Sequence, residues 1–121
     1  MNQSSQKKRI AIIGGGPGCL FVLKNLIGLK ARFEIEVFEK SEQVGAGMPY
    51  SNAGASMEHI TNVSDNEITP IVTSVKKWVD TIDEATLEKF GINPEYFTRY
   101  HVLPRLLLGQ YLTAQFKLLR R

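Results

Sequence analysis

The alternation of apolar and polar residues predicts a strand, a helix and a second strand near the start of the chain. Residues 10–13 form an apolar run that leads into a glycine-dense turn at residues 14–18. Apolar residues then recur at the spacing of one helix face over residues 20–27. Residues 33–38 begin with apolar and acidic side chains in alternation, which is typical of a strand, and Glu39 follows. We therefore expect a β-α-β unit of about 30 residues.

Three helices are predicted in the second half of the chain. The first has an apolar face at helical spacing, made by Val75, Trp78, Val79 and Ile82. The second covers residues 84–90, and the Asn93-Pro94 pair after it resembles a helix cap with a proline in the first turn. The third begins near Pro104 and buries one stripe, Leu108, Tyr111, Leu112, Phe116 and Leu119. Gly109 weakens this last helix by about 1 kcal/mol relative to alanine.

Residues 41–73 show no sustained period of a helix or a strand and are rich in Gly, Ser, Asn and Thr. Irregular segments of this length are usually either functional or disordered. Apolar residues within it, such as Met48 and Ile60, argue against disorder. We therefore expect a loop that packs around a bound ligand.

Length and composition indicate the fold class. A chain of 121 residues with 43% hydrophobic residues suits one small α/β domain over residues 1–121, with a flexible tail at residues 1–8. Only two strands are predicted, and a two-stranded sheet leaves its backbone edges open. We therefore expect an incomplete Rossmann-like fold, with a β-α-β unit, a long loop and then helices. Its remainder would be a missing C-terminal portion or a partner subunit.

Charge and cysteine usage exclude several classes of protein. The net charge is +3, but basic residues crowd the ends, at residues 7–9 and 120–121, without the interleaved aromatic residues that grip nucleic acid. The chain has no uninterrupted apolar run of about 18 residues, so no membrane segment is expected. Its single cysteine excludes an intrachain disulfide. These features predict a cytoplasmic protein that binds neither nucleic acid nor membrane.

The glycine turn and Glu39 together predict a dinucleotide site. The turn, Gly14, Gly15, Gly16, Pro17 and Gly18, would place bare backbone N–H groups and a helix N-terminus against a pyrophosphate. Glu39 lies 25 positions after Gly14 and can accept hydrogen bonds from both hydroxyls of an adenosine ribose. Its charge argues against a 2′-phosphate. The alternative is an ordinary glycine turn between a strand and a helix.

Cys19 occupies the position of the third glycine in the G-x-G-x-x-G pattern. A thiol near a helix N-terminus can be activated as a thiolate. We favour the alternative, a small buried side chain that packs between helix and sheet.

Five segments resemble the opening of bacterial FAD/NAD(P)-binding proteins, a group of flavoproteins with two dinucleotide-binding domains. They are residues 14–18, 37–40, 45–51, 59–63 and 103–112. Many flavoproteins share the glycine turn and the Val-Phe-Glu-Lys sequence, whereas the Gly-Met-Pro-Tyr-Ser loop is more specific. The resemblance covers nearly the whole chain from Arg9 onward.

The resemblance implies roles for individual residues. It places the turn glycines, Gly14, Gly16 and Gly18, at the FAD pyrophosphate, and Glu39, followed by Lys40, at the adenosine ribose. It lets the next loop pass close to the cofactor at Gly45 and Gly47. Arg105 stands where related flavoproteins have an arginine that contacts FAD phosphates or ribose; a surface arginine at a helix start is an equal alternative.

The resemblance implies the FAD-binding N-terminal region of an oxidoreductase, with NAD(P)H as a further cofactor of a complete protein. Whether the chain is itself an enzyme stays open, because the regions for NAD(P)H and substrate are expected outside it. The alternatives are a noncatalytic dinucleotide-binding or interaction module, and an NAD-binding Rossmann half. No catalytic residue is assigned. No metal site is predicted, because His59 and His101 have no ligand partner at a useful spacing.

Overall fold

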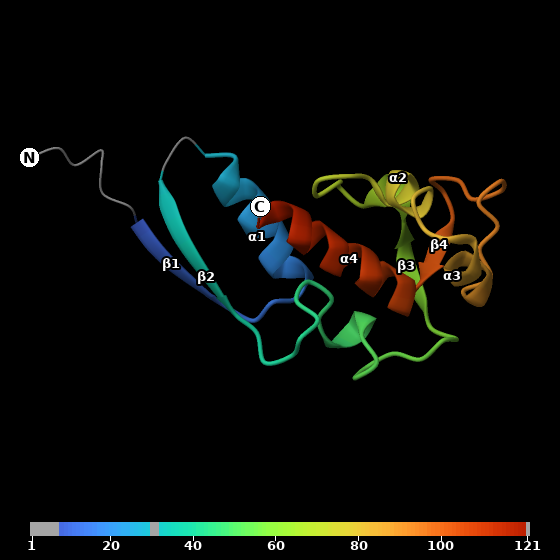
Figure 1. Ribbon diagram of the computed structural model, residues 1–121, viewed down its shortest axis with the longest axis horizontal. Helices are drawn as coiled ribbons and strands as arrows, with labels where there is room; N and C mark the ends of the chain where they lie inside the picture. The colour runs from blue at the N-terminus through green and yellow to red at the C-terminus, as the bar shows by residue number, and fades with distance from the viewer. Residues whose placement is uncertain (1–7, 30–31, 121) are drawn as a thin grey trace, which may run out of the picture.

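A computed structural model describes residues 8–29 and 32–120. Residues 1–7 of the expected tail lie outside these ranges, and Lys8 is the first residue of a strand. The predicted β-α-β unit is confirmed as β1 (Lys8–Ile13), α1 (Pro17–Ile27) and β2 (Phe33–Phe38) (Figure 1). The two strands are parallel, and Ile10 pairs with Ile35.

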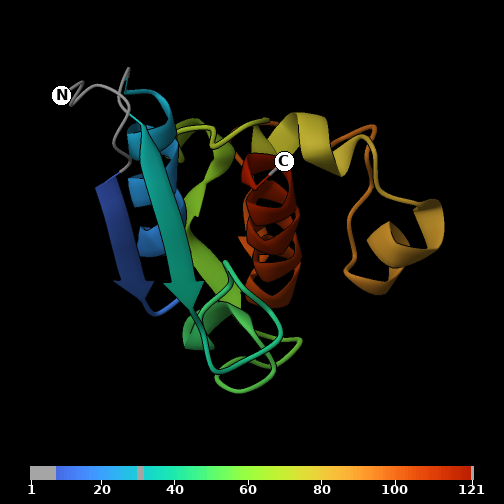
Figure 2. The same cartoon turned by 60° about the vertical axis from the view of Figure 1, so that its left-hand side comes forward.

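The two faces of this sheet differ in chemistry. The odd-numbered residues of β2, Phe33, Ile35 and Val37, are half-buried on the face that α1 covers (Figure 2). The opposite face is mixed: Arg9 lies 3.8 Å from the carboxylates of both Glu34 and Glu36, whereas the apolar Ile13 and Phe38 are exposed at the carboxyl ends of the strands. The period of two in the sequence therefore corresponds to one covered face and one exposed face.

The core forms around α4 (Arg105–Leu119), which lies beside α1 (Figure 1). Tyr111 and Leu107 of α4 are fully buried. They pack with residues of α1, of α2 (Val75–Val79) and of α3 (Glu84–Lys89), among them Leu20, Val75, Val79 and Leu87. Within the described ranges, no helix is long and apolar enough to cross a membrane.

A second sheet corrects the expectation that residues 41–73 are irregular. β3 (Ile60–Ser64) pairs antiparallel with β4 (Val102–Pro104). Burial along β3 is the reverse of what residue polarity predicts: the polar Thr61 is buried, whereas the apolar Ile60 is 57% exposed. The Thr61 hydroxyl accepts a hydrogen bond from the Leu103 amide at 3.2 Å, which satisfies it in the core. The segment also contains two 3₁₀ helices, Met48–Tyr50 and Asp65–Glu67.

The prediction of a helix start at Asn93-Pro94 is wrong, because this segment forms turns. The Asn93 side chain accepts a hydrogen bond from the Glu95 amide at 3.1 Å, and its carbonyl accepts one from Tyr96. An asparagine side chain that bonds to the backbone two residues later stabilises a turn, and no helix needs to follow it. The predicted first helix also ends earlier than expected, at Val79, although Ile82 still packs against the core.

Two buried polar side chains hold the connections around the core. Asp65 is 2% exposed and accepts hydrogen bonds from the Val75 amide at 3.0 Å and from Arg99 Nε at 3.3 Å. Gln115 on α4 accepts hydrogen bonds from the amides of Val72 and Thr73, each at 2.8 Å. Both side chains accept hydrogen bonds from backbone N–H groups that are buried and can no longer bond to water.

Candidate functional site

The glycine turn lies where β1 ends and α1 begins. The Gly14 amide donates to the Phe38 carbonyl at 2.8 Å, so the turn is tied to the end of β2. Gly14 has φ of +93°, a conformation that side chains disfavour. The carboxyl ends of both parallel strands and the start of α1 therefore meet on one side of the molecule, which is where α/β folds bind ligands.

The glycines of the turn fall into two groups by their surroundings. A Cβ on Gly15 would lie 2.9 Å from Val44 Cγ1 and 3.0 Å from Glu39 Cβ, so packing alone requires glycine there. A Cβ on Gly14 or Gly18 would have no neighbour within 4 Å among the described residues. Gly18 also lies inside α1, where alanine is the better helix former. Neither packing nor backbone geometry explains Gly18.

Glu39 is held beside the turn by the backbone. Its carboxylate accepts hydrogen bonds from the Ser41 amide at 2.8 Å and from the Gly15 amide at 2.9 Å. These bonds, that from Ser41 first, lower the pKa of Glu39 below its usual value. The Glu39 carboxylate is thus ionised at neutral pH. A carboxylate can accept about four hydrogen bonds, so it has acceptor positions left after the two backbone bonds.

The first turn of α1 contains no side chain that caps the helix or complements its dipole. Its N-cap is Gly16, which has no capping side chain, Pro17 fills a first-turn position, and the first turn holds no acidic residue. Most helices satisfy these amides with a side-chain oxygen. The Cys19 amide donates to the Gly16 carbonyl at 3.0 Å and the Gly15 amide donates to Glu39, so among the described residues the Gly18 amide is the first-turn donor left for an anion.

Cys19 is buried, with 6% of its surface exposed, as the packing interpretation predicts. Burial, and secondarily the negative charge of Glu39, raise the pKa of its thiol. An activated thiolate would need a lowered pKa. The burial of Cys19 and the raised pKa of its thiol therefore favour the packing interpretation over an activated thiolate.

The loop after Glu39 returns to the glycine turn. The Gly45 amide donates to the Gly15 carbonyl at 2.5 Å. Gly45 and Gly47 have φ of +105° and +70°, and a Cβ on Gly47 would lie 3.1 Å from Pro17 Cδ. The structure thus brings Gly47 against Gly16 and Pro17 of the turn.

Arg105 and Lys40 are placed differently. The Arg105 amide donates to the His59 carbonyl at 2.8 Å, and its Nε donates to the Ile60 carbonyl at 3.1 Å, so the residue joins α4 to β3. No hydrogen bond or ion pair within the described chain joins it to the glycine turn. Lys40 directly follows Glu39 and is exposed.

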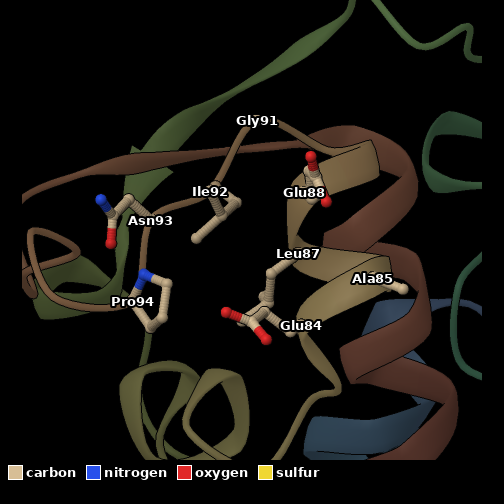
Figure 3. A pocket seen from close by; sticks show the side chains of 8 residues that line it. All are labelled: Glu84, Ala85, Leu87, Glu88, Gly91, Ile92, Asn93 and Pro94. Atoms are coloured by element: carbon tan, nitrogen blue, oxygen red, sulfur yellow. The ribbon is translucent and has the colours of Figure 1, made fainter.

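A hollow of about 630 Å³ lies away from the glycine turn. It is formed by α3 and the turn after it, and Figure 3 shows the side chains of Glu84, Glu88 and Pro94 around it. Glu84 and Glu88 are exposed, and none of the residues of the glycine turn lines the hollow. Neither the lining residues nor the position of this hollow links it to the predicted dinucleotide site.

Comparison with known proteins gives the family. A protein family described as FAD-NAD(P)-binding matches residues 11–121. The uncharacterized protein YdhS of Escherichia coli (strain K12) is 34% identical over 109 residues, which cover 90% of this chain. The chain spans 20% of the length of that relative. No solved structure matches the chain. The chain therefore belongs to the FAD-NAD(P)-binding family, and a dinucleotide-binding role follows from that membership.

Proposed function

We propose that the chain binds the ADP part of FAD at the glycine turn and Glu39, as the N-terminal region of a flavin-dependent oxidoreductase. One observation carries the proposal: Gly18 is a helical glycine with open space where its side chain would be. Packing within the protein does not require glycine at this position, but a ligand that approaches the backbone closely would require it.

The pyrophosphate would bind at the start of α1. Gly14 and Gly18 leave the backbone accessible, and the uncapped helix N-terminus carries partial positive charge. Gly15 and Gly16 keep the turn tight enough for this approach. Pro17 has no N–H to satisfy and starts the helix with a suitable φ.

The adenosine ribose would bind at Glu39. The carboxylate is already oriented by the Gly15 and Ser41 amides, so little ordering is needed when the two ribose hydroxyls donate to it. Its lowered pKa keeps it an acceptor throughout the neutral range. The same charge disfavours a nucleotide with a 2′-phosphate.

The preference for FAD over NAD rests on the loop at residues 45–51. Its Gly-Met-Pro-Tyr-Ser sequence resembles flavoproteins, and Gly47 borders Pro17 of the turn. Lys40 and Arg105 are proposed as further contacts to cofactor phosphate or ribose. For Arg105 this requires a terminal guanidinium nitrogen, since Nε already donates to Ile60.

The bound flavin would supply hydride transfer, while the chain positions it. The regions that bind NAD(P)H and substrate are proposed to lie in the parts of a longer protein that this chain does not match, because it spans 20% of its relative. We therefore expect FAD binding with little or no turnover from this chain alone.

Titration with FAD, followed by flavin absorbance and fluorescence, tests the proposal. Glu39→Ala should weaken binding about tenfold or more, since a hydrogen bond to a charged group is worth about 1.5–3 kcal/mol. Glu42→Ala is the matched control, because Glu42 is an exposed carboxylate three positions along the same loop. Unchanged affinity in Glu39→Ala would contradict the ribose assignment. Tight NAD binding without FAD binding would instead favour the NAD-binding Rossmann half.

A further inference from the structure

We propose that a second hollow binds a small organic acid, with one carboxylate joined to an aromatic or branched aliphatic body. This hollow has a volume of about 290 Å³ and lies between the loop at residues 43–57, the end of α3 and the start of α4. A space of this size holds about ten waters, so a ligand of about ten non-hydrogen atoms would fill it. The hollow is called the acid pocket below.

The charge of the acid pocket selects an anion. Lys89, the last residue of α3, is the single charged residue among those that line it. Its exposed ammonium forms no ion pair with a carboxylate in the part of the chain that the structure describes. A carboxylate would therefore meet an opposite charge, whereas the ammonium of an amino acid would meet none.

The polar lining supplies donors beside this charge. Gln43, Asn52 and Gln110 line the acid pocket, and no hydrogen bond joins their side-chain amides to other residues in the ranges 8–29 and 32–120. The Ser51 hydroxyl instead donates within the loop, to the Met48 carbonyl at 3.3 Å. The side-chain amides are thus the neutral donors left for a carboxylate, and an ionised acceptor strengthens such bonds.

The apolar lining requires a ligand with an apolar body. Phe90 and Leu106 are half-buried in the wall of the acid pocket, and Met57 is 42% exposed there. Lys89 Nζ lies 5.8 Å from the centre of the Phe90 ring, so one small molecule can meet both groups. Covering these side chains removes apolar surface from water, and a thioether packs well against an aromatic ring. An inorganic anion would leave this surface uncovered.

The acid pocket is separate from the positions proposed for the ADP part of FAD. Neither the glycine turn nor Glu39 contributes to its lining. The two sites share one loop, because Gly45 lies between lining residues of the pocket and its amide donates to the Gly15 carbonyl of the turn. The organic acid would therefore bind beside the dinucleotide without occupying the same space.

Titration with hydrocinnamate, followed by NMR of the side-chain amides, tests this proposal. We expect saturable shifts at Gln43, Asn52 and Gln110, with a Kd of about 1 mM or tighter. Hydrocinnamamide has the same shape without the charge, and phenylalanine adds an ammonium group, so both should bind about tenfold or more weakly. Lys89→Gln should weaken binding of the acid about tenfold and leave that of the amide unchanged. Lys117→Gln, at an exposed lysine of α4 outside the pocket, is the matched control.

Each outcome has a defined meaning. Failure of both hydrocinnamate and isocaproate to saturate, or equal affinity for the acid and its amide, would overturn the proposal. Gln110→Trp should fill the pocket at an exposed helix position and abolish binding with little change in Tm, and retained binding would overturn the location. Release of hydrocinnamate by saturating FAD would assign the pocket to the dinucleotide and overturn a separate site. A chain that binds hydrocinnamate but not FAD would contradict the proposed function alone.

Discussion

The Gly15 amide donates a hydrogen bond to the carboxylate of Glu39 at 2.9 Å, across 24 positions of sequence. This bond joins the glycine turn after β1 to the residue that follows β2. The group proposed to bind the ribose therefore also fixes the turn proposed to bind the pyrophosphate. If the proposed ribose contact holds, fold and binding depend on the same carboxylate, and substitutions at Glu39 and at Gly18 test the two roles separately.

Glu39→Gln should reduce the loss of folding stability that occurs as the pH falls. The folded state lowers the pKa of Glu39, so the unfolded chain takes up its proton first. Its contribution is fully present above the ordinary glutamate pKa of about 4.3 and is lost as pH falls through the lower folded value. Urea unfolding at a series of pH values should show a smaller acid loss for Glu39→Gln than for the wild type. Glu42→Gln is the control, and identical profiles for both variants would contradict a role of these hydrogen bonds in stability.

Gly18→Ala should separate binding from folding. Its Cβ meets nothing within 4 Å and alanine favours a helix, so Tm should stay equal or rise. FAD affinity should fall about tenfold or more, because the methyl group occupies the approach of the pyrophosphate. Gly28→Ala at the other end of α1, where a Cβ would lie 3.5 Å from the Lys24 carbonyl oxygen, should leave affinity unchanged. Unaltered affinity in Gly18→Ala would count against the proposed phosphate position.

Gly109→Ala should destabilise the fold by about 1–3 kcal/mol in spite of the better helix propensity of alanine. The new Cβ would overlap the Tyr50 carbonyl oxygen, a backbone atom that cannot turn aside. Chemical denaturation measures the loss. Thr113→Ala on the same helix is the control and should be close to neutral, because the buried Thr113 hydroxyl has no hydrogen-bond partner among the described residues. A Gly109→Ala variant as stable as the wild type would show that the loop moves freely.

Tyr111→Phe should reduce the fall in the free energy of unfolding at alkaline pH. Burial raises the pKa of Tyr111 to about 12, whereas the unfolded side chain titrates near 10. The unfolded state therefore loses its proton first, and stability falls between about pH 10 and pH 12 by up to about 3 kcal/mol. The variant should lose about 1 kcal/mol at neutral pH with the bond from its hydroxyl to the Thr73 carbonyl. Tyr96→Phe, at a side chain that is 70% exposed, should change neither quantity.

The β-α-β unit could be predicted from sequence because its signals are local. Period-two strands, a glycine turn and a helical stripe all specify the same elements in residues 8–38. The family assignment followed from the same residues and the loop after them, and the match over residues 11–121 confirms it. The roles of Glu39 and Arg105 toward a cofactor remain predictions.

The second sheet could not be predicted because its alternation is inverted. Thr61 lies inside and Ile60 outside, and the reason is a hydrogen bond to Leu103, 42 positions away. Gly109 shows the same limit. Propensity treats it only as a weak point of α4, whereas the close approach of Tyr50 requires it. Contacts between distant segments override local preference in both cases.

The parallel arrangement of α1 and α4 has a kinetic consequence. The two helices lie side by side with both N-termini directed to the same side of the molecule, as Figure 1 shows. Each terminus carries roughly half a positive charge, and Arg105 adds a full one at the start of α4. The ionised Glu39 beside the glycine turn offsets about half of this positive charge, and the remainder would draw an anionic ligand toward this side before any contact is made. The rate of encounter with a dinucleotide should therefore fall as ionic strength rises, even where the affinity of the bound state changes little.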